Sequence, residues 1–254
     1  MKISVCTDML LGDIPTPEAL RLVKAAGADA AEFWGTGGKD LAVIAAVARE
    51  IELPIATFCA PGPSLISPEG PVGFAAALRE NVACCDTLAC RQLIVTSGKP
   101  EWGWTPAEMH TNLTESLLAA VPVLEEYDLI LTIEPLNSSE QSYLCSSREA
   151  FDICRLAGSP HLRVLYDLYH MQYMEGNLLN TLLANLPAVG HLHAANLPGR
   201  ISPARGEINY PHIVKELEIM GYTGYLGFEF LPQQCEKQAI VAEIATAISL
   251  VRMK

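Results

Sequence analysis

Leu129-Ile130-Leu131-Thr132-Ile133 is a short apolar run of strand character, and it ends at an acidic residue, Glu134. Three later stretches repeat this arrangement: Leu162-Arg163-Val164-Leu165-Tyr166 before Asp167, Val189-Gly190-His191-Leu192 before His193, and Tyr225-Leu226-Gly227-Phe228 before Glu229. In a parallel barrel, the C-terminal ends of the strands are where chemistry takes place. Four polar side chains at successive strand ends therefore indicate both a fold and a site.

The rest of the chain shows the same alternation of strand-like and helix-like segments. Four earlier strands are predicted at Ile3–Cys6, Ala30–Phe33, Ile55–Phe58 and Leu93–Thr96. Helices are predicted at about Pro17–Ala26, Leu41–Ile51, Val72–Ala89, Pro106–Tyr127, Ser147–Leu156, Asn177–Asn185, Pro211–Met220 and Gln233–Val251. Eight strands alternating with helices predict parallel pairing through crossover connections.

The predicted fold is therefore α/β, a single (β/α)8 TIM barrel that forms one domain over residues 1–254. A length of 254 residues is typical of this barrel. The alternative is an open doubly wound sheet, which would need about six strands and a glycine-rich first turn. Here the stretch after the first strand reads Thr7-Asp8-Met9-Leu10, without glycine.

Local patterns support these boundaries. Thr105-Pro106-Ala107-Glu108 and Ser146-Ser147-Arg148-Glu149 both predict capping boxes at helix starts. Gly27 and Gly221 follow helical stretches where a left-handed residue is expected.

Side chains alternate in direction along a strand. If Glu134 points into the barrel, Thr132 does too, whereas Leu131 and Ile133 face the helices. By the same rule His191 lies one layer below His193.

Composition limits the classes of function. A formal net charge of −12 argues against an extended basic surface for nucleic acid or anionic membrane. The eight cysteines are scattered, with no CxxC pair, which favours reduced thiols in a cytoplasmic protein. No apolar run is long enough to span a bilayer, and Asp8 interrupts the first apolar stretch, so we expect neither a membrane span nor a signal peptide.

Glu134, Asp167, His193 and Glu229 together form a candidate metal site. Three carboxylates and one imidazole suit one divalent ion such as Mg²⁺, Mn²⁺ or Co²⁺. The absence of thiolates among them argues against a structural zinc site. The competing interpretation is that the four are unrelated polar groups at strand ends.

Five stretches in the C-terminal half also resemble hydroxypyruvate isomerases, which belong to the wider group of xylose isomerase-like TIM barrels. They are Ile133-Glu134-Pro135-Leu136-Asn137, Tyr166-Asp167-Leu168-Tyr169-His170-Met171-Gln172 with Met174-Glu175-Gly176-Asn177, Gly190-His191-Leu192-His193 through Asn196-Leu197-Pro198-Gly199-Arg200, Gly206-Glu207-Ile208-Asn209-Tyr210-Pro211, and Gly227-Phe228-Glu229-Phe230. The resemblance implies that the four residues above bind the metal. It also implies that Glu134 and Glu229 are the catalytic proton-transfer pair, and that His170 and Arg200 contact the substrate.

The chain departs from that family pattern in two places. His193 stands where hydroxypyruvate isomerases usually have glutamine, a feature more similar to the ketose epimerases. The N-terminal half matches poorly, with Ala31-Glu32-Phe33-Trp34-Gly35 in place of a Val-Glu-Phe motif and a different aromatic loop.

The chemistry expected of this site is isomerisation through an enediolate. A divalent ion stabilises the enediolate charge, and a carboxylate moves the carbon-bound proton. We expect the protein to interconvert a small hydroxy-carbonyl substrate, with hydroxypyruvate and tartronate semialdehyde or a related oxo-acid or sugar favoured. The same residues would serve a ketose 3-epimerase or an inosose dehydratase-like lyase.

Two other classes are less favoured. An endonuclease IV-type phosphodiesterase needs further histidines at earlier strand ends, which here read Phe58-Cys59 and Thr96-Ser97-Gly98. A non-catalytic binding protein would not need all four residues of the set. The expected partner is a small carbohydrate or oxo-acid, and a homo-oligomer is possible.

Several single residues have two interpretations. Arg200 is expected to clamp a substrate carboxylate, or else to be a solvated loop charge. Glu207 is assigned to substrate binding, with a role in organising its loop as the alternative. Glu32 faces the same mouth or pairs with a neighbouring loop, and His191 is expected to support a ligand from the interior. Trp34, Trp102 and Trp104 are expected to wall the pocket or to pack, and Cys6 and Cys59 to pack.

Overall fold

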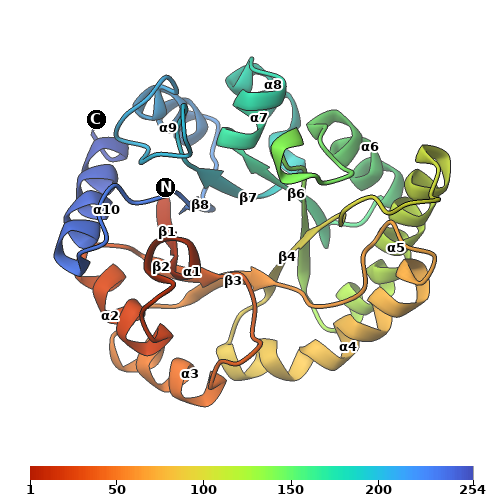
Figure 1. The fold of residues 1–254 in the computed structure, drawn as a ribbon, viewed down its shortest axis with the longest axis horizontal. Helices are drawn as coiled ribbons and strands as arrows, with labels where there is room; N and C mark the ends of the chain where they lie inside the picture. Colours follow the sequence, from red (N-terminus) through yellow and green to blue (C-terminus); the bar gives the residue numbers. More distant parts are fainter. Residues whose placement is uncertain (254) are drawn as a thin grey trace.

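The structure, a computed structural model, describes residues 1–253. Eight parallel strands form a closed barrel in which each strand pairs with the next and β8 pairs with β1 (Figure 1). The strands are Lys2–Cys6 (β1), Ala30–Phe33 (β2), Ile55–Cys59 (β3), Gln92–Thr96 (β4), Ile130–Glu134 (β5), Leu162–Asp167 (β6), Val189–Ala194 (β7) and Tyr225–Phe228 (β8).

Helices surround the barrel on the outside (Figure 1). The α-helices are Thr7–Leu11 (α1), Thr16–Ala25 (α2), Leu41–Glu50 (α3), Gly70–Leu88 (α4), Pro106–Glu126 (α5), Ser147–Ala157 (α6), Leu168–Met174 (α7), Leu178–Asn185 (α8), Tyr210–Ile219 (α9) and Lys237–Val251 (α10). Two 3-10 turns lie at Ser138–Glu140 (η1) and Leu186–Ala188 (η2). The last helix, α10, packs against both α9 and α2 and so completes the ring.

The closed strand order confirms the predicted (β/α)8 barrel and excludes the open sheet. An open sheet would leave its first and last strands unpaired, whereas β1 and β8 pair from Lys2–Tyr225 to Val5–Phe228. All eight predicted strands are present. The largest difference at a helix start is in the last helix, which begins at Lys237 rather than Gln233.

Two short helices directly after strands were not predicted. Helix α1 occupies the stretch after β1 that reads as a turn in the sequence, and α7 begins immediately after β6. Asp167 caps α7, because its side chain accepts hydrogen bonds from the backbone N–H groups of Tyr169 and His170. Helices of five and seven residues are too short to show a clear hydrophobic period.

The predicted side-chain directions are confirmed in β5. Thr132 points into the barrel, because its methyl group would lie 2.6 Å from a Cβ added to Gly190, on a strand that is not adjacent to β5. Leu131 and Ile133 belong to the hydrophobic core. On β6, Tyr166 faces outward and stacks on Phe151 of α6, so its neighbour Asp167 faces the interior.

Of the two predicted capping boxes, one is complete. At the start of α5, Thr105 accepts from the N–H of Glu108, and the Glu108 carboxylate accepts from the N–H of Thr105. At the start of α6, Ser146 accepts from the N–H of Glu149, but the Glu149 carboxylate bonds to His110 of α5 instead. The predicted left-handed glycines, Gly27 and Gly221, have φ values of +92° and +83°.

Among residues 1–253, no helix is both long and apolar enough to cross a membrane. All eight cysteines are free thiols, and Cys235 is the exposed one.

Thr105→Ala is expected to lower the free energy of unfolding by about 1 kcal/mol, because it leaves the first N–H groups of α5 without their cap. Thr87→Ala is the matched control, since Thr87 is an exposed residue of α4 whose hydroxyl donates to the Ala83 carbonyl one turn earlier. Its effect is expected to stay within about 0.5 kcal/mol. Urea denaturation of both variants measures the difference, and equal losses would contradict the capping role.

Candidate metal and active site

Glu134, Asp167, His193 and Glu229 meet at the C-terminal mouth of the barrel. Glu134 and Asp167 are the last residues of β5 and β6, His193 lies one residue before the end of β7, and Glu229 directly follows β8. Each offers one ligand atom, and these four atoms all lie within 4.8 Å of one another. All four side chains are buried. The closed barrel thus brings together four residues that are spread over positions 134 to 229 of the sequence.

Several polar atoms of this cluster are buried without a hydrogen-bond partner among the described residues. They are Glu134 Oε1, Asp167 Oδ2 and both ring nitrogens of His193, Nδ1 and Nε2. A buried polar atom left unpaired costs about 1–3 kcal/mol, so such atoms are uncommon in folded proteins. Carboxylate oxygens and an imidazole nitrogen converging on one point are the donors that a divalent cation takes. The cluster therefore fits one such ion.

Asp167 has a divided role. Its Oδ1 accepts from the N–H of Tyr169 at 2.7 Å and from that of His170 at 3.4 Å, which leaves Oδ2 directed at the cluster. Burial raises the pKa of the Asp167 carboxyl, and the positive charges of Arg200 and His193 offset this only in part. The helix cap thus orients a carboxylate whose charge is poorly compensated by the protein alone.

Glu229 is held from two sides. The indole N–H of Trp34 donates to Oε1 at 2.5 Å, and the guanidinium of Arg200 bonds to Oε2. Burial would raise the pKa of Glu229, but His193 and Arg200 more than offset it and lower this pKa well below the usual range. Glu229 is therefore an ionised carboxylate with both oxygens engaged, in contrast to Glu134.

Arg200 lies in the cavity, as expected, but its guanidinium is already paired. The backbone of Arg200 is left-handed (φ +56°). Its guanidinium carbon lies 5.4 Å from the centroid of the Tyr169 ring. Besides Glu229, it contacts Glu140 Oε1 at 3.4 Å. The interpretation of Arg200 as a solvated loop charge is wrong.

His170 faces the cavity in one tautomer. Its Nδ1 accepts from the backbone N–H of Asn137 at 3.1 Å, so that nitrogen carries no hydrogen. The hydrogen must then be on Nε2, which lies 3.4 Å from Asp167 Oδ2. Burial is the main cause that lowers the pKa of His170 to about 4. At neutral pH this imidazole is an uncharged donor at the edge of the cluster.

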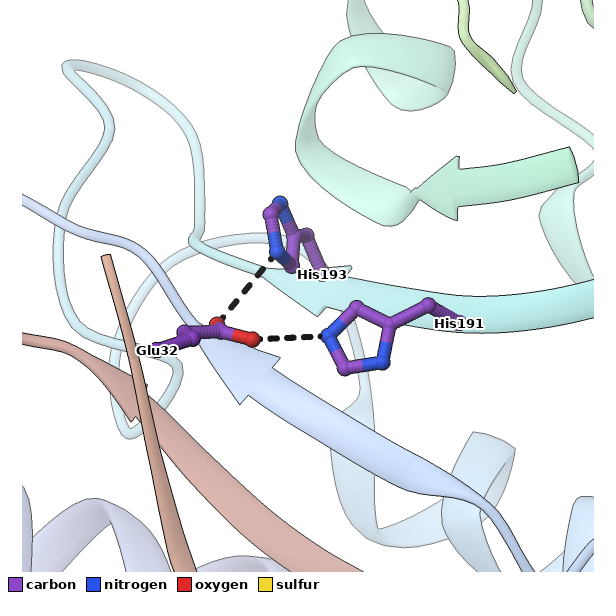
Figure 2. Close-up of side chains that lie close together, drawn as sticks. All are labelled: Glu32, His191 and His193. Atoms are coloured by element: carbon purple, nitrogen blue, oxygen red, sulfur yellow. Dashed lines mark hydrogen bonds and ion pairs between the residues drawn. The ribbon is translucent and has the colours of Figure 1, made fainter. Parts of the chain in front are cut away.

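Glu32, one residue before the end of β2, turns into the barrel rather than toward a loop. Figure 2 shows its carboxylate between the imidazoles of His191 and His193. Oε2 lies 2.9 Å from His191 Nε2, and Oε1 lies 3.3 Å from His193 Nε2. The sequence placed Glu32 at the mouth but did not connect it with the histidines of β7. His191 pairs with Glu32, and its ring also lies edge-on to that of His193, with the ring centroids 5.1 Å apart.

Three members of the cluster, Glu134, His193 and Glu229, line a cavity of about 200 Å³. The lining residues are Cys6, Glu32, Phe33, Trp34, Cys59, Ile94, Thr96, Glu134, Leu136, Glu140, His170, His193, Arg200 and Glu229. Cys6 and Cys59 were expected only to pack, but both lie on this wall.

Three residues expected near the cavity lie elsewhere. Glu207 is exposed and bonds to Gln172, so the structure does not bring it to the cavity. The expectation that Trp102 walls the pocket is wrong, because its side chain is fully exposed. Trp104 packs against the core.

Comparison with known proteins agrees with this geometry. Residues 20–248 match the model of the xylose isomerase-like TIM barrel family. The chain belongs to this family. The match extends from the second helix into the last one and so includes every residue of the four-residue cluster.

Two curated relatives show which members of this family the chain is similar to. It is 36% identical to the hydroxypyruvate isomerase of Escherichia coli (strain K12) over 163 residues, which are 63% of this chain and 62% of that protein. It is 30% identical to the 2-oxo-tetronate isomerase of Cupriavidus necator over 129 residues, which are 50% of each chain. The chain thus spans about six tenths of the length of the first of these relatives, and half of the second.

A solved structure with a different name is also similar. The crystal structure of AP endonuclease, family 2, from Brucella melitensis superimposes with a TM-score of 0.84 at 26% sequence identity. The superposition covers 94% of this chain and 96% of that one.

The His170 imidazole is expected to stay neutral well below pH 6, because burial disfavours its charged form and the Asn137 N–H occupies Nδ1. A folded pKa of about 4, below the unfolded value near 6.5, means that this group's contribution to stability is complete above pH 6.5 and falls as the pH drops toward 4. ¹⁵N NMR titration of the metal-free protein reads the ring directly. Protonation near pH 6.5 would contradict the assignment.

Proposed function

We propose that this protein is a metal-dependent isomerase that moves a carbonyl group to the adjacent carbon of a small hydroxy-carbonyl compound. The observation that carries the proposal is the buried cluster of Glu134, Asp167, His193 and Glu229, in which atoms of the first three have no hydrogen-bond partner among the described residues. Similarity to relatives named hydroxypyruvate isomerase and 2-oxo-tetronate isomerase supports the same class of reaction. The substrate class favoured is a small oxo-acid such as hydroxypyruvate.

The four residues would hold one divalent ion, with Mg²⁺, Mn²⁺ and Co²⁺ as candidates. When bound, such an ion acts as a Lewis acid that stabilises the negative charge of an enediolate. The protein supplies the groups that move the proton. Glu134 has the freer carboxylate, since its Oε1 has no partner in the described chain, and we assign it to taking the proton from carbon. Glu229 is held by Trp34 and Arg200, and we assign it to returning a proton to the adjacent carbon.

The contacts of Arg200 favour a substrate that carries a carboxylate. Its contact with Glu229 is short and buried, whereas the 3.4 Å contact with Glu140 involves a carboxylate that is 41% exposed. A surface ion pair of this kind contributes about 0–1 kcal/mol. A substrate carboxylate that displaces Glu140 would meet Nη1 of a guanidinium whose other edge stays fixed by Glu229.

A phosphodiesterase activity fits less well, although the Brucella structure is named AP endonuclease. At the ends of β3 and β4 the cavity is lined by Cys59 and Thr96. Neither side chain is the histidine that a multi-zinc site would need there. A net charge of −12 further disfavours a DNA ligand.

The cytoplasmic location suggested by the free thiols stays a prediction.

Mn²⁺ is expected to bind at one site and to change the tryptophan fluorescence, because Trp34 bonds directly to the proposed ligand Glu229. Trp34→Phe should abolish the optical signal while calorimetry still detects binding. Trp102→Phe is the matched control, since Trp102 is fully exposed and should leave the signal intact. An equal signal from all three proteins, or no binding by the unaltered chain, would contradict the site.

The reaction is tested by incubating hydroxypyruvate and neutral ketoses with the Mn²⁺-loaded protein in D₂O and following the products by NMR. We expect tartronate semialdehyde, with deuterium at the carbon that gains a proton. Glu134→Gln and Glu229→Gln should each lower kcat by about 10²-fold or more, because each removes a proton-transfer group. Glu140→Gln is the control, since this carboxylate contacts Arg200 but not the cluster, and kcat should change by less than about tenfold.

The other products of this experiment identify the rival reactions. Deuterium at C3 of a ketose with an unmoved carbonyl would indicate an epimerase. A product lighter by one water would indicate a lyase. Either outcome would overturn the proposed isomerisation.

A further inference from the structure

Glu32 reaches across the interior of the barrel to the histidines of β7. Strands β1 and β8 separate β2 from β7 in the barrel order. Glu32 is 1% exposed as a residue, and its two carboxylate oxygens lie 2.9 Å from His191 Nε2 and 3.3 Å from His193 Nε2. Ser4 on β1 donates a further hydrogen bond to Oε2 at 3.3 Å. This is a built contact between distant strands, and proton transfer at Glu134 and Glu229 does not account for it.

Gly227 on β8 leaves the space that this contact needs. A Cβ added at Gly227 would lie 2.2 Å from Glu32 Oε1 and 2.8 Å from His193 Cδ2. No left-handed backbone angle requires glycine at this position. Position 227 is therefore a glycine because Glu32 and His193 approach closely over it, and not because its backbone conformation requires one.

The carboxylate determines which nitrogens carry hydrogen. An ionised carboxylate only accepts hydrogen bonds, so the nitrogens that face it must be donors. Nε2 of His193 faces Glu32 Oε1 at 3.3 Å, a charge-pair contact and not an aligned hydrogen bond, and the acceptor beside it favours a hydrogen on this nitrogen. Nδ1 of the same ring lies 3.5 Å from Glu134 Oε1 and 3.3 Å from Glu229 Oε2, on the side of the four-residue cluster. In Figure 2 this second ring nitrogen points away from Glu32.

We propose that Glu32 is a positioning residue for His193: it holds the Nε2–H side of the ring so that Nδ1 is presented to the metal, while His191 fixes the second oxygen of Glu32. The inference rests on the metal site of the proposed function. A ligand imidazole whose other N–H donates to a carboxylate has a fixed orientation and a more basic ligand nitrogen. Gly227 belongs to this arrangement because any side chain there would separate Glu32 from His193.

A second cation site formed by Glu32, His191 and His193 is the competing interpretation, since their ligand atoms also lie within 4.8 Å of one another. That site would need bare Nε2 atoms on both imidazoles. The 2.9 Å separation between Glu32 and His191 is instead the length of a hydrogen bond from N–H to oxygen. The two interpretations differ in stoichiometry, with one ion for positioning and two for a second site.

The test compares Glu32→Met with Thr132→Val, both at buried positions inside the barrel. Thr132 donates to the Leu93 carbonyl at 3.0 Å and is bonded to neither Glu32 nor His193, so its variant loses a buried hydrogen bond outside the Glu32–His193 pair. Mn²⁺ calorimetry should give one ion per wild-type chain. Kd should rise by about 10–100-fold in Glu32→Met and stay within about threefold in Thr132→Val.

An independent spectroscopic measurement uses the metal-free proteins. In ¹H–¹⁵N spectra of the histidine rings, the Nε2–H signal of His193 should be protected from exchange in wild type and Thr132→Val and lost in Glu32→Met. Gly227→Ala keeps every polar group and removes only the space. It should weaken Mn²⁺ binding in the same direction and keeps the test decisive if Glu32→Met folds poorly.

Unchanged Mn²⁺ affinity in Glu32→Met and Gly227→Ala would overturn this inference alone, and so would an unchanged Nε2–H signal in Glu32→Met. Two ions per wild-type chain, with one lost in Glu32→Met, would replace it with the second cation site. Failure of the wild-type protein to bind Mn²⁺ would overturn the metal site itself and the inference with it.

Discussion

Closure of a parallel barrel is the constraint on which the rest of this structure depends. Because all eight strands run in one direction, their C-terminal ends surround a single mouth. Residues 95 positions apart in the sequence, Glu134 and Glu229, are thereby brought to one cluster with Asp167 and His193. Pairing of β1 with β8 completes the ring and also brings Trp34, after β2, within hydrogen-bonding distance of Glu229.

The sequence predicts much of the fold and the members of the cluster, because strand ends and side-chain alternation are local properties. Contacts between strands that are not neighbours require the register, which the sequence does not show. Glu32 illustrates this: it approaches His193 through the space left by the missing side chain at Gly227, and the β2–β3 register shifts between Ala31 and Glu32. Local pattern likewise failed to show that Trp102 is exposed while Trp34 lines the cavity.

The cavity concentrates charge that the protein alone does not fully compensate. Glu32, Glu134, Asp167 and Glu229 are all buried, and the cations facing them are Arg200 and the imidazole of His193. Burial would lower the pKa of His193, but Glu32 and Glu229 raise it well above its ordinary value. A folded protein retains unpaired buried charge mainly at functional positions, where the cost to stability is offset by function. A divalent cation is the partner that this balance of charges favours.

The two halves of the barrel contribute differently to this cavity. Residues from β5 onward supply most of the charged and titratable groups, and all of these except Glu140 lie in the stretches that resemble hydroxypyruvate isomerases. The wall from β1 to β4 is mainly apolar, with Cys6, Phe33, Trp34, Cys59 and Ile94. Apolar walls select by shape, and one methylene changes discrimination by only about 1–3 kcal/mol. Under the proposed function, the C-terminal half would therefore supply the reacting groups and Arg200, whereas the apolar N-terminal wall, where the family motifs are least matched, would discriminate among small substrates by shape.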